Sequence, residues 1–201
     1  VVTADEIRDR QFQTITDLYA SVPGWMPSSL AYNVFPVALV RGQVQAVQFL
    51  HDGVSLFDPY VNIATTSRVQ PMEMIKRVEM ITGPGGVLWG SNSLLGILNV
   101  ITKDAEDVDG VEVGGAVGDG RGDRLMGRAY VMVGKTGMMQ GKLKVFGHAS
   151  VESYDGAGQK FPVLQFHSAL PQPNSPNVYG PLVTSDQPRS LLVSFDGKVS
   201  Y

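Results

Sequence analysis

The chain has 201 residues, 23 glycines, no cysteine and a formal net charge of −3. This length allows one or two domains with a buried core. The lack of cysteine excludes disulfide scaffolds and thiolate metal sites, although it is compatible with an oxidising compartment. Because no basic stripe is present, we expect no nucleic-acid partner. The three histidines lie far apart without metal-ligand spacing, so we expect neither a metal site nor a cofactor.

The N-terminus reads Val1-Val2-Thr3 and lacks the basic and apolar segments of a signal peptide. We expect either that a signal peptide has been removed or that the sequence starts inside a longer protein. No stretch reaches the ~18 apolar residues of a transmembrane helix. Membrane-spanning β-strands escape such a scan, so a membrane location stays open.

Two short helices are predicted at the start of the chain. Thr3 and Glu6 have the spacing of a capping box, which predicts a helix ending near Arg10. Thr14 begins a second predicted helix, which ends near Ser21. Residues 25–33 mix proline, serine and asparagine with aromatic residues, and we predict a loop there.

Strands and turns follow. Residues 37–41 and 46–51 are predicted strands, and the Asp52-Gly53 pair predicts a hairpin leading to residues 54–57. Pro71 suits the first turn of a short helix that leads into a strand at residues 75–82. We predict that residues 1–104 form a small α+β domain with a mixed sheet, and that residues 104–109 form an acidic hinge.

Residues 78–103 are the most informative stretch of the chain. Two β-type runs, 78–82 and 97–102, flank a glycine-rich turn with a single helical turn at residues 87–89. The spacing of Gly85 and Gly90 resembles a phosphate loop, but the lysine that reaches the phosphates is missing. A nucleotide-binding enzyme is therefore a weak alternative. We identify neither a nucleophile elbow nor a catalytic triad in the sequence.

After residue 109 the apolar residues recur at every second position, which is the period of a β-strand. Apolar and polar side chains alternate in residues 125–133, 142–153 and 190–201, and the charges stay on one face. A half-buried soluble sandwich would show the same alternation. Strands of ~10 residues also match membrane-spanning β-strands, in which a lipid-facing lysine or arginine costs ~2–4 kcal/mol.

The connections between these predicted strands differ in length. Residues 135–139 form a short turn, whereas residues 154–188 form a long connection rich in proline, glutamine and asparagine. Outer-membrane barrels have short periplasmic turns and long outer loops. Four strands cannot close such a barrel, so we expect a piece of a longer receptor or a barrel completed by another chain.

Several motifs in order resemble those of TonB-dependent outer-membrane receptors. In that family a strand, a Gly-Pro turn, a Leu-Tyr-Gly step, a glycine-rich bend and a final strand close the plug domain. The matching residues here are Gly83-Pro84, Leu88-Trp89-Gly90, Asn92, Gly96 and Asn99-Val100-Ile101-Thr102-Lys103, preceded by Thr3–Ile7, Val22-Pro23-Gly24, Val40-Arg41-Gly42 and Asp52-Gly53-Val54.

The resemblance implies an α+β plug domain at residues 1–104, followed by an antiparallel transmembrane β-barrel. Residues 109–201 would be its first four strands, with a long outer loop, out of about 22 strands in the family. The implied function is TonB-energised import of a scarce nutrient across the outer membrane, with no enzymatic activity. The nutrient could be a siderophore, a cobalamin, a sugar or a peptide.

The resemblance also implies partners and a location. The TonB protein would bind a box upstream of Val1, the plug would fill the barrel lumen, and the N-terminus would be periplasmic. Outer-membrane lipid, the remaining barrel strands and a small-molecule ligand are the other implied partners.

Site residues follow from the same resemblance. Ligand-facing plug loops map onto residues 28–33, 43–45 and 57–62, although an ordinary surface or plug–barrel contact is the alternative for each residue. The candidate ligand-binding residues are Tyr32, Asn33, Gln43, Tyr60 and Asn62. The residues with an implied structural role in the plug are Arg41, Gly42, Asp52, Gly53, Gly83, Pro84, Gly90, Gly96 and Asn99.

Two positions depart from the family pattern. In the family an arginine precedes Gly-Pro and contacts acidic groups of the barrel wall, and here Thr82 stands at its position. Leu95 replaces a glycine of the bend. We expect tighter packing at Leu95.

The alternative function is a structural or signalling outer-membrane component that retains the plug-barrel fold without transport. Thr82 favours it, as does the lack of a convincing TonB box within residues 1–201.

Overall fold

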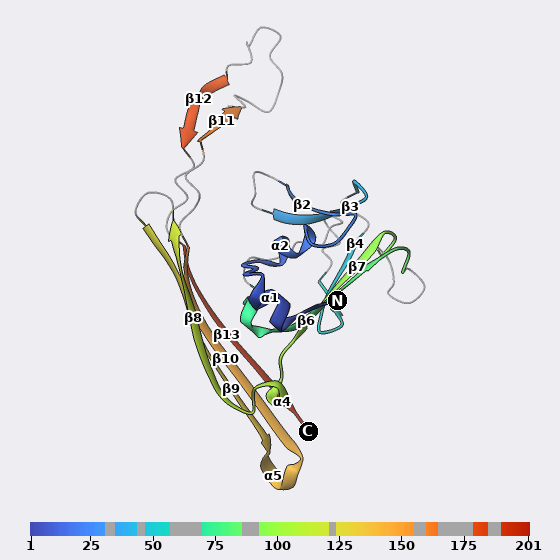
Figure 1. Cartoon of the computed structure of the whole chain (residues 1–201), viewed down its shortest axis with the longest axis vertical. Coiled ribbons are helices and arrows are strands. Elements are labelled where there is room, and N and C mark those ends of the chain that lie inside the picture. Colours follow the sequence, from blue (N-terminus) through green and yellow to red (C-terminus); the bar gives the residue numbers. More distant parts are fainter. Residues whose placement is uncertain are drawn as a thin grey trace, which may run out of the picture. The chain divides into compact units, whose positions relative to one another are not determined.

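The computed structural model describes residues 1–30, 35–43, 47–56, 70–85, 93–120, 124–154, 160–164, 179–184 and 190–201. Its first sheet, the mixed sheet, has five strands (Figure 1). In spatial order these are β1 (Val2–Thr3), β6 (Ile75–Thr82), β7 (Gly96–Thr102), β4 (Val47–His51) and β5 (Val54–Ser55).

Strand β7 lies at the centre of the mixed sheet. It pairs antiparallel with β6, where Ile75 is opposite Thr102 and Thr82 is opposite Gly96. It pairs parallel with β4, where His51 is opposite Val100. The start of β6, the end of β4 and the end of β7 therefore meet at one edge, and the predicted mixed sheet is confirmed.

Both predicted N-terminal helices are present. Helix α1 (Ala4–Asp9) begins after Thr3 and helix α2 (Ile15–Tyr19) begins after Thr14, each with a reciprocal capping box. In α1 the Glu6 amide donates to the Thr3 hydroxyl, and the Glu6 carboxylate accepts from the Thr3 amide. These bonds satisfy amides that have no partner inside the helix, which is why the capping residues locate the helix starts.

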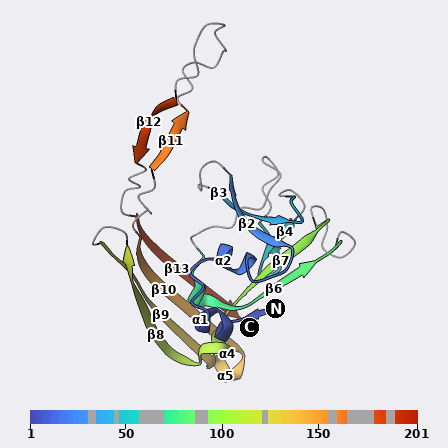
Figure 2. The ribbon, with the colours of Figure 1, turned by 45° about the horizontal axis from the view of Figure 1, so that its top comes forward.

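The loop predicted at residues 25–33 is wrong for residues 25–30, and residues 31–33 lie outside the described residues. Strand β2 (Trp25–Leu30) pairs antiparallel with β3 (Phe35–Val40), for example Pro27 opposite Ala38 and Ser28 opposite Val37 (Figure 2). The polar composition of this segment argued for a loop, but cross-strand pairing with the apolar β3 outweighs that local preference. Proline is tolerated because a two-stranded ribbon leaves one side of each strand without a ladder.

The core lies on the face of the mixed sheet that β4, β6 and β7 share. Phe49, Val78, Leu98 and Val100 are at most 5% exposed and belong to one cluster of buried apolar residues. Other members of the cluster come from the helices and the β2–β3 hairpin, namely Ile7, Ile15, Leu18, Tyr19, Trp25, Ala38 and Val40. Burial of this apolar surface is the main term that stabilises the domain.

Trp25 fixes the hairpin to the end of the β6–β7 pair. Its indole is 3% exposed, and its Nε1 donates a hydrogen bond of 2.8 Å to Thr82 Oγ1. Gly96, opposite Thr82, leaves room for the ring, because a Cβ there would lie 2.8 Å from Trp25 Cζ2. The indole therefore needs a small residue beneath it and a hydroxyl beside it.

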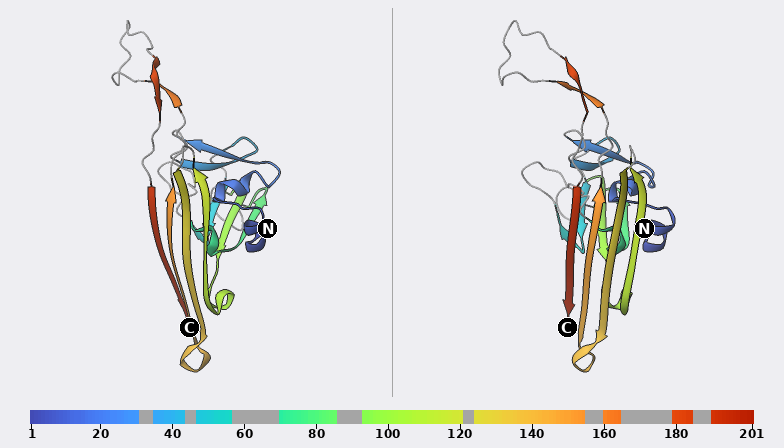
Figure 3. Two further views of the ribbon diagram at one scale, coloured as in Figure 1. Left: turned by 60° about the vertical axis from the view of Figure 1, so that its left-hand side comes forward. Right: turned by 90° about the vertical axis from the view of Figure 1, so that its left-hand side faces the viewer.

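The second sheet, the long-strand sheet, has antiparallel strands that lie side by side (Figure 3). In spatial order they are β13 (Ser190–Ser200), β10 (Leu143–Tyr154), β9 (Arg124–Gly137) and β8 (Gly110–Gly120). The predicted alternation is confirmed: Val131 and Val133 are 37% and 46% exposed, whereas Met132 between them is 0% exposed.

Short elements occupy the connections. The predicted turn at residues 135–139 begins three residues and ends two residues too early, since β9 runs to Gly137 and α5 (Met138–Gly141) makes the turn. The long connection contains the paired strands β11 (Lys160–Leu164) and β12 (Tyr179–Thr184). A 3₁₀ turn η1 (Met72–Met74) precedes β6, and helix α4 (Ala105–Val108) precedes β8. Among the described residues, no helix has the length and apolar character to cross a membrane.

The chain divides into two compact units. One contains Val1–Val111, Val133–His148 and Gly197–Tyr201, so it includes the mixed sheet and one end of strands β9, β10 and β13. The other contains Glu112–Met132 and Ala149–Asp196.

We expect Gly96→Ala to destabilise the mixed-sheet domain by about 1–3 kcal/mol, because the new methyl group overlaps the buried Trp25 ring. Both tryptophans of the chain, Trp25 and Trp89, lie before residue 97, so tryptophan fluorescence during urea unfolding follows this domain alone. As a control, Gly147→Ala in β10 places a Cβ with no described atom within 4 Å. An unchanged urea midpoint for Gly96→Ala would contradict the packing described here.

Candidate functional site

The Asp52-Gly53 turn connects β4 and β5 as predicted. Asp52 and Gly53 have φ angles of 48° and 81°, the combination that a tight hairpin turn requires at its two central residues. His51 pairs with Val54 across the turn. The Asp52 amide donates to the carbonyl of Val100 at 2.8 Å, which ties the turn to β7.

The Asp52 carboxylate collects three hydrogen bonds from two strands. Its Oδ1 accepts from the Thr102 amide at 2.8 Å, and its Oδ2 accepts from the Thr102 hydroxyl at 2.6 Å. Lys198 Nζ on β13 lies 2.9 Å from Oδ2. Burial alone would raise the pKa of Asp52, but the hydrogen bonds from Thr102 and Lys198 outweigh burial, so the pKa lies below its ordinary value.

Asn99 lies on the face of β7 opposite to the core residues Leu98 and Val100. It is 7% exposed, its Nδ2 donates to Glu79 Oε2 at 3.4 Å, and its Oδ1 accepts from the Gly53 amide at 3.4 Å. Glu79 also pairs with Arg77 at 2.8 Å. Asn99 therefore contacts both β6 and the Asp52 turn, which gives this buried amide a structural role in the sheet.

The glycine-rich turn is closed by backbone hydrogen bonds at its base. The Gly83 amide donates to Leu95 at 2.9 Å, and the Gly85 amide donates to Ser93 at 2.7 Å. Gly83 has a φ of 133°, which favours glycine. Pro84 lies between these two amides and donates none of its own. The predicted helical turn at residues 87–89 and Gly90 lie outside the described residues.

The two departures from the family pattern lie within the domain. Thr82, at the position of the family's arginine, accepts the hydrogen bond from Trp25 described above. Leu95 is partly buried and packs against the core cluster.

The predicted ligand-binding residues are largely beyond the described part of the chain. Tyr32, Asn33, Tyr60 and Asn62 lie outside it. Gln43 is exposed and bridges to Val40 in the turn after β3, next to Arg41 and Gly42 with φ angles of 51° and 82°. The ligand-binding group therefore stays a prediction, and the positive φ angles show that Arg41-Gly42 is a turn.

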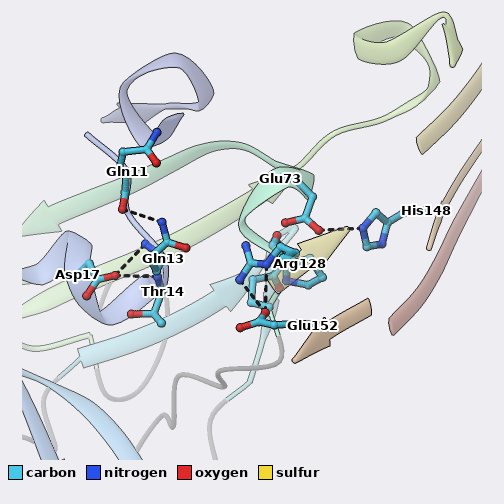
Figure 4. Close-up of polar contacts among 10 residues, drawn as sticks. Gln11, Gln13, Thr14, Asp17, Glu73, Arg128, His148 and Glu152 are labelled. Atoms are coloured by element: carbon cyan, nitrogen blue, oxygen red, sulfur yellow. Dashed lines mark hydrogen bonds and ion pairs between the residues drawn. The ribbon is translucent and has the colours of Figure 1, made fainter. Parts of the chain in front are cut away.

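A buried polar pair was missed by the sequence analysis. Glu73 in η1 lies 3.3 Å from His148 in β10, measured from Oε1 to Nε2 (Figure 4). The side chains are 6% and 0% exposed. Neither residue stands in a recognisable motif, and only the strand alternation placed His148 on the same face as Lys144. The long sequence separation of the pair left no signal that could have joined them.

The predicted acidic hinge at residues 104–109 contains the short helix α4 (Ala105–Val108). Asp104 caps α4, Asp107 Oδ1 lies 2.7 Å from Lys76 Nζ of β6, and Glu106 pairs with Lys144 of β10. Burial would raise the pKa of Asp107, but its hydrogen bonds with Lys76 and the Asp104 amide lower it. The same hydrogen bond with Asp107 raises the pKa of Lys76. The acidic residues are thus engaged with partners on both sides of the helix.

The long-strand sheet has polar pairs of its own on the face opposite its exposed apolar side chains. Arg128 of β9 donates to Glu152 of β10 from Nη2 at 2.7 Å and from Nε at 3.1 Å (Figure 4). The Tyr130 hydroxyl donates to Glu112 at 3.1 Å. A Cβ at Gly114 would overlap the Tyr130 ring, so the glycine makes room for this aromatic residue. Arg128, Glu152 and Glu112 are therefore engaged on this face, whereas Lys135 is exposed near the end of β9.

We expect the stability of the mixed-sheet domain to fall more steeply with acid in the wild type than in Asp52→Asn. A depressed folded-state pKa adds stability above the ordinary aspartate pKa of about 3.9, and this is lost as the pH falls through the lower, folded-state value. Urea midpoints from tryptophan fluorescence between about pH 6 and pH 3 measure this. Asp5→Asn, on the exposed side of α1, is the matched control. If the urea midpoints of the wild type and of Asp52→Asn differ by the same amount at every pH in this range, the expectation is contradicted.

Comparisons with known proteins agree with this geometry. A family described as the TonB-dependent Receptor Plug Domain matches residues 1–97. The chain is 34% identical over 112 residues to the vitamin B12 transporter BtuB of Vibrio vulnificus, covering 55% of the chain and 18% of that protein. It is 27% identical over 106 residues to the pesticin receptor of Yersinia enterocolitica, covering 53% and 16%. The chain thus spans about a fifth of the length of these relatives.

Solved structures share the fold. The ferric yersiniabactin uptake receptor FyuA from Yersinia pestis aligns with a TM-score of 0.57 at 22% identity, over 77% of this chain and 24% of that one. The pyoverdine outer membrane receptor FpvA from Pseudomonas aeruginosa aligns with a TM-score of 0.58 at 21% identity, over 75% and 21%. Residues 1–97 therefore match the plug domain of TonB-dependent receptors, and the described strands after them share the fold of these solved receptors.

Proposed function

We propose that this chain is the plug and the first four barrel strands of an outer-membrane receptor that imports a scarce nutrient with energy from TonB. The observation that carries the proposal is the plug domain at residues 1–97, joined to a sheet of long antiparallel strands. The proposed boundaries are residues 1–104 for the plug and 109–201 for the strands. The proposed role of the plug is to obstruct the barrel lumen until TonB displaces it.

The side chains of the long-strand sheet support a lipid-facing role for its exposed face. Leu191, Phe195 and Val199 of β13 are 70%, 77% and 71% exposed. In water so many exposed apolar residues in one strand would favour aggregation, whereas in a bilayer they are favourable. The ion pair between Arg128 of β9 and Glu152 of β10 lies on the other face, where a lumen provides water and polar partners.

The proposed ligand belongs to the small, scarce nutrients that an outer membrane does not pass freely. The named relatives are a vitamin B12 transporter and a pesticin receptor, and the solved neighbours include receptors for ferric yersiniabactin and pyoverdine. These names favour a cobalamin or a ferric siderophore over a sugar or a peptide. We propose that the plug loops contact the ligand through Tyr32, Asn33, Gln43, Tyr60 and Asn62.

A second candidate is an outer-membrane component that keeps the plug-barrel fold for a structural or signalling role. The observation in its favour is Thr82, which replaces the family's arginine and is bonded to Trp25 within the plug. Dependence on TonB separates the two candidates, because only the importer needs energy from the inner membrane.

We expect uptake to require both TonB and the proton gradient of the inner membrane. The full-length receptor is produced in a Gram-negative strain that lacks its own cobalamin and siderophore receptors. Radiolabelled vitamin B12 and iron-loaded siderophores are then supplied one at a time, with and without TonB and with and without a protonophore. Equal uptake in all conditions would point to a passive pore, and no uptake of any probe by a correctly assembled receptor would favour the second candidate.

We expect the long connection to face the outside of the cell and the α5 turn to face the periplasm. The chain has no native cysteine, so single cysteines can be labelled on a clean background. Ser175→Cys, which lies outside the described residues, should react in intact cells with a charged thiol reagent that cannot cross the outer membrane. Met139→Cys in α5, where the methionine is 71% exposed, should react only after that membrane is opened.

Both changes lie in connections, where substitutions usually alter stability by no more than about ±0.5 kcal/mol, so the receptor should still assemble. Labelling of Met139→Cys, but not of Ser175→Cys, in intact cells would reverse the proposed strand directions. Equal labelling of both sites would contradict a membrane-spanning barrel.

A further inference from the structure

Two polar contacts join the mixed sheet to neighbouring strands of the long-strand sheet. His148 of β10 lies 3.3 Å from Glu73, and Lys198 of β13 lies 2.9 Å from Asp52. We call Glu73–His148 and Asp52–Lys198 the anchor pairs. All four residues belong to one compact unit, and β10 and β13 are hydrogen-bonded neighbours.

Both anchor pairs hold the same edge of the mixed sheet. Glu73 lies two residues before β6, whose first residue is opposite Thr102. Asp52 directly follows β4, whose last residue is opposite Val100. Lys198 Nζ also donates to the Thr102 carbonyl at 3.4 Å, so it contacts the Asp52 turn and the last residue of β7 together. Residues from two long strands thus hold three strands of the mixed sheet at the edge where the chain continues into α4.

The contacts between the two sheets differ in burial, and the most buried one is expected to contribute most to stability. The Lys144–Glu106 pair beside α4 has side chains that are 41% and 58% exposed, and such surface pairs contribute little. The Asp52–Lys198 pair is intermediate, at 32% and 35%. The side chains of Glu73 and His148 are 6% and 0% exposed. Loss of one partner there removes a polar contact at a site from which water is excluded, and this is strongly destabilising.

The charged groups on the neighbouring elements have partners of their own. On β6, Lys76 pairs with Asp107 and Arg77 pairs with Glu79. On β10, Lys144 pairs with Glu106. None of these three ion pairs includes a residue of the anchor pairs.

We propose that His148 and Lys198 are positioning residues, which hold the plug in its closed position and set how readily it is displaced. This inference rests on the proposed function, because a closed position has meaning only for a plug that obstructs a lumen. It adds two specific residues of the long strands to that function and ranks His148 above Lys198 by burial.

The test measures passive leakage of vancomycin, which is too large for ordinary outer-membrane pores. Cells that lack TonB produce the full-length receptor or its variants, so leakage reports only plugs that are displaced without energy. We expect His148→Ala to raise the leakage rate about tenfold or more, because the displaced population grows as the closed state loses a buried contact. Lys198→Met should raise the rate by a smaller factor, because its pair is more exposed.

Matched variants separate the anchor pairs from general damage. His148→Gln keeps a hydrogen-bonding side chain and Lys198→Arg keeps the charge, so both should leak close to the wild-type rate. Lys135→Met removes a charge from an exposed position of β9 and should have no effect. Glu73→Ala combined with His148→Ala should leak no more than His148→Ala alone, because the two residues act as one pair.

Wild-type leakage in a folded His148→Ala receptor would overturn the proposal, as would equal leakage from His148→Gln and His148→Ala. Resistance of the barrel to unfolding in SDS at room temperature shows that each variant is folded. If His148→Ala does not assemble, Glu73→Gln takes its place and should also raise leakage. Because the assay needs neither ligand nor TonB, a failure of energised uptake would contradict the proposed function without changing this result.

Discussion

The carboxylate of Asp52 fixes the edge of the mixed sheet on which the rest of the structure depends. It accepts hydrogen bonds from the amide and the hydroxyl of Thr102, and it pairs with Lys198. Thr102 is the last residue of the central strand β7, and Asp52 is in the turn that ends β4. A half-buried carboxylate without such donors would be costly, so Thr102 and Lys198 stabilise the charged form of Asp52 at this position.

The two sheets bury their side chains according to different rules. The mixed sheet packs Phe49, Leu98 and Val100 in one cluster with apolar residues of the helices and the β2–β3 hairpin, as a water-soluble domain does. The long-strand sheet instead exposes apolar residues such as Leu191 and Phe195, and its ion pair Arg128–Glu152 lies on the other face. One chain therefore combines a packed mixed-sheet domain with a sheet that exposes apolar residues on one face, and the solved receptors share this fold.

Local chemistry accounts for the parts of the fold that the sequence predicted. The capping boxes at Thr3 and Thr14 located two helices, because each supplies hydrogen bonds over only three residues. The Asp52-Gly53 pair located a hairpin, because few other residues accept two successive positive φ angles. Alternation located the long strands, since it repeats over their whole length.

Long-range pairing accounts for the parts that could not be predicted. Strand β2 was missed because Pro27, Ser28 and Ser29 have little strand preference, and only pairing with β3 makes them extended. The Trp25–Thr82 bond joins residues 57 positions apart, and the Glu73–His148 pair joins residues 75 positions apart. No spacing rule connects such positions, so the contacts that hold the domain to the long strands appear only in three dimensions.

The central claim is that the plug is seated against β10 with Glu73 beside His148, and a cross-link tests it most directly. Cysteines replace both residues in the full-length receptor, and a short bismaleimide, with a span similar to the two side chains it replaces, is added in the absence of ligand. The account predicts rapid intramolecular cross-linking, which is seen as a shift in gel mobility of the unfolded receptor and is absent from either single-cysteine variant. A pair at Thr3 and Arg77, which face each other across β1 and β6, is the positive control. Cross-linking of that control pair without cross-linking of the Glu73 and His148 positions would contradict the account.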